Sequence, residues 1–299
     1  SNYRALDISK SSEPVFVAVR SSATTEDLAE ASFAGQQDSF LNVKGNSDLI
    51  LHIKKCFASL FTARATYYRN KQGFKYEEAS LAVVVQKMVD SAKSGVIFSK
   101  DPSYDNENII IEAVWGLGEG IVSGLITPDK YVVSRNMDIK DKKIADKKVA
   151  ITRNSGGGKL KVNLTEEKSK QQVLKTYEIK KLSQIALDLE HHYNAPQDIE
   201  FAIEGEDIFI VQTRPITTMK KRIGEEEESK ELSGEVILTG LAASPGIGVG
   251  KVKIIKDLAD LPKIKEGDIL VTTMTNPDMV VSMQKATAIV TDQGGLTAH

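Results

Sequence analysis

The chain has 299 residues, of which 41% are hydrophobic and 27% are charged, and its formal net charge is −2. This composition is typical of a soluble globular protein of about two domains and excludes a disordered chain. The near balance of basic and acidic residues argues against a nucleic-acid-binding protein, and no apolar run reaches the ~20 residues of a membrane-spanning helix.

The first predicted strand covers residues 14–19 and leads into a loop over residues 20–27, which Arg20 opens. A guanidinium offers a planar fork of donors, and the hydroxyl residues that follow add theirs, so this loop suits a phosphate. Loops rich in Ser and Thr are common, so the pattern alone does not define a site. Within residues 31–40, Gly35 would let the backbone approach a ligand closely.

Residues 47–71 are predicted to form one long helix, because apolar residues recur at three- and four-residue steps. We interpret this stripe as core, with Gly73 ending the helix. Cys56 cannot form an internal disulfide, and burial is expected for it rather than catalysis, which indicates a reducing cytoplasm. The stripe consists of Leu49, Ile53, Cys56, Phe57, Leu60, Phe61 and Tyr68.

Four strands are predicted next, over residues 81–89, 95–99, 108–113 and 129–134. Gln86 is a polar exception in the first of them, and a solvated strand end and a ligand contact are equally compatible with it. Residues 115–120 form a glycine-rich loop that lacks the spacing of a dinucleotide fingerprint. The Lys-rich residues 138–162 are interpreted as hairpins with a solvated surface.

A second long helix is predicted from Thr165, which can cap it, to about His191. His191 and His192 are adjacent, so on a helix they face different directions and cannot easily share a metal. We therefore interpret both histidines as surface residues.

Residues 198–215 predict a hairpin, because two apolar strands flank a short polar turn. If the loop covers residues 205–207, Glu200 lies opposite Gln212, and Asp198 lies opposite Arg214; a two-residue loop would shift this register by one. A carboxylate and an amide oxygen that face each other can hold Mg²⁺, and an arginine beside them can meet a phosphate. A polar solvent-facing hairpin is the alternative interpretation.

Residues 219–231 are a charge run without apolar periodicity, which predicts a flexible linker. Strands are then predicted at residues 251–255 and 269–272, followed by a short helix that Asn276 caps, with Pro277 at its first position. A final apolar segment, residues 286–291, leads to a Gly-Gly turn and His299. Neutral imidazole is a nucleophile, and exposed backbone N–H groups beside it would favour a bound anion.

Three stretches of the sequence carry a resemblance to a known family. Residues 19–43 pair a Val-Arg-Ser-Ser-Ala-Thr stretch with a Ser-Phe-Ala-Gly-Gln stretch, and residues 294–299 read Gly-Gly-Leu-Thr-Ala-His. With the Gln-Thr-Arg-Pro of residues 212–215, these motifs resemble the phosphoenolpyruvate synthase family, of which pyruvate phosphate dikinase is a relative. The resemblance covers nearly the whole chain.

The resemblance implies an α+β fold in which an ATP-grasp-type nucleotide-binding domain, residues 1–218, precedes the linker. Residues 232–299 would form a truncated phosphohistidine domain of the swivelling type. The family uses ATP and Mg²⁺ to phosphorylate a histidine, and the swivelling domain then carries the phosphoryl group to a barrel domain that holds pyruvate. The implied site residues are Arg20, Gly35, Ser39, Gln86 and Arg214 for the nucleotide, Glu200 and Gln212 for the metal, and His299 as the nucleophile.

Two departures from the family pattern limit this expectation. The Lys-bearing glycine-rich segment that precedes the position of Arg20 in the family is absent, and so is the barrel domain. We therefore expect weak ATP binding and no phosphoenolpyruvate formation by this chain alone. Partners other than ATP, such as nucleic acid or a membrane, are not expected, and the full-length parent could form a homo-oligomer. Thr297 matches a regulatory phosphorylation site of the dikinases.

Three functions stay open on the sequence alone. The first is the nucleotide-binding and phosphohistidine part of a phosphoenolpyruvate synthase. The second is a fragment of a related dikinase or antibiotic phosphotransferase. The third is a non-catalytic nucleotide-binding or docking module.

Overall fold

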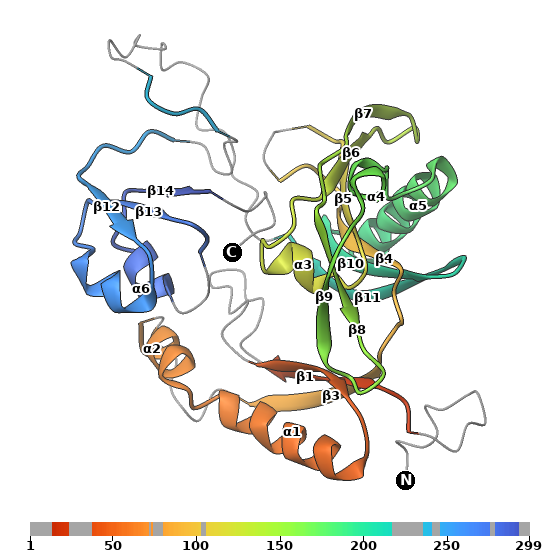
Figure 1. Cartoon of the computed structure of the whole chain (residues 1–299), viewed down its shortest axis with the longest axis horizontal. Helices are drawn as coiled ribbons and strands as arrows, with labels where there is room; N and C mark the ends of the chain where they lie inside the picture. Colours follow the sequence, from red (N-terminus) through yellow and green to blue (C-terminus); the bar gives the residue numbers. More distant parts are fainter. Residues whose placement is uncertain are drawn as a thin grey trace. The chain divides into compact units, whose positions relative to one another are not determined.

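The computed structural model has a mixed α+β fold with antiparallel sheets, drawn in Figure 1. It describes residues 14–23, 38–71, 73, 80–102, 106–216, 236–240, 246–275 and 279–292. Two compact units are interleaved along the chain, one of residues 1–92, 151–162 and 202–209, the other of residues 93–150, 163–201 and 210–299. Within the described ranges, no helix combines the length and the apolar character needed to cross a membrane.

The first unit contains an antiparallel sheet of order β2-β1-β3. Its strands are β1 Val17–Ala23, β2 Ser39–Val43 and β3 Leu81–Lys87. The prediction of a loop from Arg20 onward is wrong for the described residues, because β1 pairs with β3 along its whole length, up to Ala23 opposite Leu81. Backbone pairing therefore holds Arg20 in a strand.

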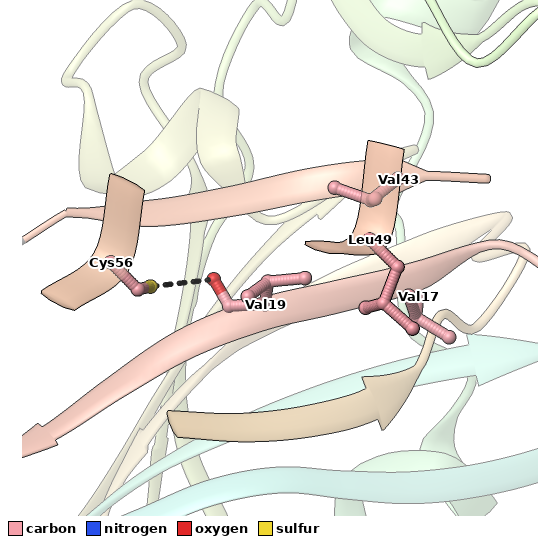
Figure 2. Packing of buried hydrophobic residues seen from close by; sticks show 5 residues of the cluster. All are labelled: Val17, Val19, Val43, Leu49 and Cys56. Carbon is pink, nitrogen blue, oxygen red and sulfur yellow. Dashed lines mark hydrogen bonds between the residues drawn. The ribbon is translucent and has the colours of Figure 1, made fainter. Parts of the chain in front are cut away.

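Helix α1, Asn46–Ser59, covers one face of this sheet. Figure 2 shows the buried residues of that contact, Val17, Val19, Val43, Leu49 and Cys56. The Cys56 side chain is fully buried, and its Sγ donates to the backbone oxygen of Val19 over 3.5 Å. The expected burial of Cys56 is confirmed.

The single helix predicted over residues 47–71 is wrong, since the chain turns after Ser59 and a second helix, α2 Ala63–Lys71, begins. Thr62 explains the break, because its Oγ1 accepts a hydrogen bond from the Ala65 backbone N–H and so caps the new helix. The apolar stripe is also only partly core, as Phe57 is 47% exposed and Phe61 is 69% exposed.

Among the described residues, the largest sheet has six strands in the order β11-β10-β4-β5-β6-β7. The pairs β4–β5, β5–β6 and β6–β7 are antiparallel, and helix α5, Thr176–Tyr193, contacts β4 and β5. A separate hairpin consists of β8 and β9. The strands are β4 Lys93–Phe98, β5 Ile109–Trp115, β6 Asp129–Val133, β7 Ile139–Lys143, β8 Val149–Arg153, β9 Lys159–Asn163, β10 Gln197–Glu204 and β11 Asp207–Pro215.

The second predicted long helix is divided into α4 Glu166–Lys170 and α5, although Thr165 caps α4 as expected. Strand β6 causes the division, because Asp129 accepts a hydrogen bond from the Val173 backbone N–H at 2.8 Å, and the Tyr131 hydroxyl accepts one from Leu174. These backbone donors therefore serve β6 and not a continuous helix.

Asp129 also forms an ion pair with Lys147, and both side chains are fully buried. The interpretation of residues 138–162 as a wholly solvated basic segment is therefore wrong at Lys147. The same segment does contain the predicted β8–β9 hairpin, and every residue of β9 is exposed. His191 and His192 are exposed at the end of α5, as expected.

The C-terminal part contains a parallel sheet of order β12-β13-β14. Ile255, Ile264, Leu270 and Met279 form its small core. The strands predicted at residues 251–255 and 269–272 are confirmed, whereas Asn276, Pro277 and the linker at residues 219–231 lie outside the described residues. The elements are β12 Val252–Ile255, β13 Ile269–Thr272, β14 Ala288–Thr291, the 3-10 helix η3 Leu258–Lys263, α6 Val280–Met283 and, earlier in the chain, α3 Glu119–Val122.

Candidate functional site

Three of the predicted nucleotide residues come together on one face of the β2-β1-β3 sheet. Arg20 lies on the central strand, directly opposite Ser39 of β2, and its Nη1 donates to Gln86 Oε1 of β3 over 3.2 Å. Paired residues of neighbouring strands share a face, so the three side chains point to the same side. Residues far apart in the sequence thus form one polar group, which we call the Arg20 group.

The Arg20 group faces away from helix α1. Val17 and Val19 alternate with Arg20 along β1 and are buried against α1, which leaves the opposite face to Arg20. Ser39 is exposed, and Arg20 and Gln86 are partly exposed. A guanidinium oriented by an amide and placed beside a hydroxyl is suited to bind an anion such as a phosphate.

The β10–β11 hairpin carries the other predicted residues. Its turn covers residues 205 and 206, yet Arg214 forms an ion pair with Asp198, through Nε at 2.9 Å and Nη2 at 2.8 Å. This contact brings Asp198 and Arg214 together. The predicted three-residue loop at residues 205–207 is wrong, because β11 already begins at Asp207 and the turn has only two residues, which shifts the register that was expected from the longer loop. Asp198 therefore orients Arg214, a role that the sequence analysis did not assign to it.

Glu200 and Gln212 share that face by strand alternation. Both side chains are partly buried. No group of three or more His, Cys, Asp or Glu side chains suited to a metal occurs among the described residues. A single carboxylate with an amide oxygen nevertheless fits Mg²⁺, because this ion commonly takes only one or two protein carboxylates and completes its shell with water and phosphate oxygens.

Gly35 and His299 lie outside the described residues, so their predicted roles remain predictions. Strand β14 leads toward His299 in the sequence. The three parallel strands β12, β13 and β14 end at the same edge of their sheet, with Ile255, Thr272 and Thr291 in register. In parallel sheets, the edge at the carboxyl ends of the strands is a common position for ligands.

The glycine-rich loop predicted at residues 115–120 is shorter than expected, because Trp115 still belongs to β5 and α3 begins at Glu119. Neighbouring side chains hold it in place. Ser94 Oγ donates to the Gly116 backbone oxygen over 2.7 Å, and Lys168 Nζ lies 3.3 Å from the centroid of the Trp115 ring. Burial lowers the pKa of Lys168, and the nearby charge of Lys93 lowers it further. These contacts show how the loop is anchored and assign it no ligand.

Comparisons with known proteins identify the family. The model of the pyruvate phosphate dikinase AMP/ATP-binding domain matches residues 1–235, and the mobile domain of PEP-utilising enzymes matches residues 264–299. The chain belongs to the pyruvate phosphate dikinase AMP/ATP-binding family. The expected resemblance is thereby confirmed.

Curated relatives from archaea agree with this family. A probable phosphoenolpyruvate synthase of Archaeoglobus fulgidus is 55% identical over 288 residues, which cover 95% of this chain and 38% of the relative. The phosphoenolpyruvate synthase of Pyrococcus furiosus is 52% identical over 99% of this chain and 38% of its own length. That of Aeropyrum pernix is 40% identical, with 99% and 41% covered. The chain thus spans well under half the length of these relatives.

Proposed function

We propose that this chain is the nucleotide-binding and phosphohistidine part of a phosphoenolpyruvate synthase. The parent reaction converts ATP, pyruvate and water into phosphoenolpyruvate, AMP and phosphate. The observation that supports this most directly is the Arg20 group, in which Nη1 of Arg20 and Oε1 of Gln86 lie 3.2 Å apart beside Ser39. The proposal also draws on relatives that carry the synthase name over nearly the whole of this chain.

The two arginines, the two metal residues and His299 have distinct chemical roles in this proposal. Arg20 neutralises phosphate charge and Arg214 does the same from the hairpin, since guanidinium groups bind phosphate oxygens in a forked geometry. Glu200 and Gln212 would hold Mg²⁺, and the ion would screen the charge of the triphosphate. The imidazole nitrogen of His299 would form a bond to a phosphorus atom of ATP as a phosphoanhydride bond of the ATP breaks, and the proposed second domain, residues 232–299, would carry this phosphoryl group toward pyruvate. The ATP-grasp and swivelling descriptions of the two domains belong to the same proposal.

Thermal unfolding of the purified chain with Mg-ATP tests the nucleotide assignment. A ligand that binds only the folded state raises its stability by RT ln(1 + [L]/Kd), so millimolar Mg-ATP should raise the melting temperature even if binding is weak. ATP without Mg²⁺ and Mg²⁺ without ATP are the controls. If Mg-ATP raises the melting temperature no more than these controls do, the nucleotide assignment is wrong, and a non-catalytic scaffold or an inert fragment is favoured.

The related dikinases and antibiotic phosphotransferases are a second enzyme class to consider. The acceptor of the phosphoryl group distinguishes them from the synthase. No described residue favours them, and the curated relatives cited above all carry the synthase name.

A further inference from the structure

The β10–β11 hairpin has two polar faces with different surroundings. Asp198 and Arg214 pair on the face that carries the proposed metal and phosphate residues. On the opposite face, Thr213 Oγ1 donates to Gln197 Oε1 over 2.9 Å. Gln197 precedes Asp198, and Thr213 lies between Gln212 and Arg214 in the sequence. The Thr213–Gln197 hydrogen bond is thus a second cross-strand contact, next to the Asp198–Arg214 ion pair in the sequence but on the other face of the hairpin.

Gln197 joins three parts of the second unit. The side chain is fully buried, and its Nε2 donates to the Ala195 backbone oxygen over 2.9 Å, within the turn between α5 and β10. Its backbone N–H donates to Ser99 Oγ over 2.8 Å, while the Ser99 N–H donates to the Gln197 backbone oxygen. The residue therefore connects the turn, the end of β4 and strand β11.

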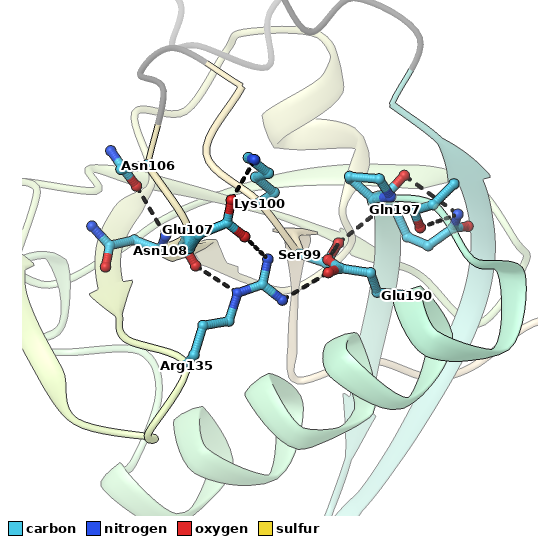
Figure 3. Close-up of polar contacts among 10 residues, drawn as sticks. Ser99, Lys100, Asn106, Glu107, Asn108, Arg135, Glu190 and Gln197 are labelled. Atoms are coloured by element: carbon cyan, nitrogen blue, oxygen red, sulfur yellow. Dashed lines mark hydrogen bonds and ion pairs between the residues drawn. The ribbon is translucent and has the colours of Figure 1, made fainter.

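The contacts continue beyond Ser99, as Figure 3 shows. Ser99 Oγ donates to Glu190 Oε2 over 2.5 Å, and Arg135 Nη1 donates to Glu190 Oε1 over 2.8 Å. We call the five residues Thr213, Gln197, Ser99, Glu190 and Arg135 the Gln197 network. It runs from β11 through the start of β10 and the end of α5 to the segment after β6.

The network is only partly buried, because Gln197 and Ser99 are fully buried whereas the side chains of Glu190 and Arg135 are 23% and 28% exposed. Its buried centre at Gln197 limits the orientations of that side chain. Each hydrogen bond contributes modestly to stability. A buried amide that loses one partner is left with an unsatisfied polar atom, so other orientations of the Gln197 side chain are disfavoured. The Thr213–Gln197 contact also joins the two strands, so it restricts their sliding. A shift of β11 against β10 would change the spacing of Gln212 and Arg214 from Glu200.

We propose that Gln197 and Thr213 are positioning residues that set the spacing of Glu200, Gln212 and Arg214 from the buried side of the hairpin. Neither residue touches the ligand in this scheme. The inference rests on the proposed function, because it assumes that the opposite face binds Mg²⁺ and phosphate. It extends that function, because the hydrogen bond between Thr213 and Gln197, on the opposite face of the hairpin, would fix the positions of the proposed metal and phosphate residues.

The test compares Thr213→Val, which removes the hydroxyl at nearly constant volume, with Thr213→Ser, which keeps it. Calorimetry on the full 299-residue chain gives the ATP affinity with and without Mg²⁺. We expect Thr213→Val to reduce the Mg²⁺-dependent gain in affinity by about three- to tenfold, and Thr213→Ser to restore most of it. Thr152→Val, at a partly exposed position on β8, is the matched control and should change nothing.

The outcomes separate this inference from the function beneath it. Glu200→Gln should weaken Mg-ATP binding whether or not Thr213 matters. If Glu200→Gln weakens binding while Thr213→Val behaves like the unsubstituted chain, the positioning role is overturned and the proposed function stands. Equal losses in Thr213→Val and Thr213→Ser also overturn it, since the hydroxyl is then irrelevant. Absence of any Mg-ATP binding by the unsubstituted chain overturns both.

Discussion

Arg20 and Gln86 are hydrogen-bonded through Nη1 and Oε1 at 3.2 Å, on neighbouring strands of one sheet face. An arginine held in this way keeps its charge but loses part of its rotational freedom. Because Ser39 lies opposite Arg20 on the third strand, the guanidinium is bordered by a polar side chain on each side. An arginine oriented in this way suits the phosphate-binding role proposed for Arg20.

The first prediction concerns this pair. Arg20→Ala should raise the dissociation constant for Mg-ATP about ten- to a hundredfold, because charge-assisted hydrogen bonds contribute roughly 1.5–3 kcal/mol. Gln86→Leu should raise it less, about two- to tenfold, since only the orientation of Arg20 is lost. Calorimetric titration measures both. Lys87→Gln, an exposed neighbour of Gln86, serves as the control, and an equal effect there would contradict the assignment.

The second prediction concerns the buried ion pair of Asp129 and Lys147. Lys147→Met should lower the free energy of unfolding by about 3–5 kcal/mol, because it leaves a buried carboxylate without its counter-ion. Lys148→Met, at the exposed next position, should change it by less than about 0.5 kcal/mol. Urea denaturation followed by circular dichroism measures both variants. Similar values for the two would show that the pair does not hold this segment on β6.

The third prediction concerns Cys56. Burial, assisted by the negative charge of Asp38, raises the pKa of the Cys56 thiol to about 11, so at pH 8 only about 0.1% is thiolate, the reactive form. The folded chain should therefore react with thiol reagents far more slowly than the urea-unfolded chain. With a disulfide reagent that releases a coloured thiolate, the absorbance gives the labelling rates of the folded and the unfolded chain. Rapid labelling of the folded chain would contradict the burial of Cys56 beneath α1.

The fourth prediction concerns pH. The hydrogen bond from Lys100 lowers the pKa of Glu107, and Arg135 acts in the same direction. A carboxyl group whose pKa is lower in the folded state stabilises the fold above its unfolded pKa, and that contribution is lost as the pH falls through the folded pKa.

The melting temperature of the unsubstituted chain should thus fall more steeply below about pH 4.3, the ordinary glutamate pKa, than that of Glu107→Gln. The difference should be small, because the Glu107 side chain is 63% exposed and solvent screens its interactions. Calorimetric scans at several pH values measure it. If the melting temperatures of the two proteins fall in parallel as the pH decreases, Glu107 does not contribute to stability in this way.

The sequence predicted most strands but misplaced the ends of the helices, for a physical reason. Apolar periodicity continues across residues 60–62 and 171–175, so spacing alone indicates unbroken helices. The breaks come from Thr62, which caps a new helix, and from Asp129 and Tyr131, which take backbone donors across a large sequence separation. Tertiary hydrogen bonds of that kind leave no periodic signal.

The candidate site was predictable to a different extent in its two parts. The resemblance supplied Arg20, Ser39 and Gln86, but only the strand pairing brings them onto one face. For the hairpin, the pairing of Asp198 with Arg214 was predicted from a loop at residues 205–207; the two side chains do form an ion pair, but the turn covers only residues 205 and 206. The contacts of Gln197 and Thr213 could not be predicted, because an isolated buried amide has no characteristic sequence pattern.

The separation of Arg20 from Gln86 by 66 positions has a consequence for folding. No local segment can assemble the Arg20 group, the proposed anion-binding group, so it exists only once the central strand has both of its neighbours. The nucleotide would then bind the folded sheet and not partly folded states, so a high ATP concentration would shift the folding equilibrium toward the folded chain. The proposed nucleotide would therefore bind only after the three strands have paired, and its binding would stabilise the completed sheet.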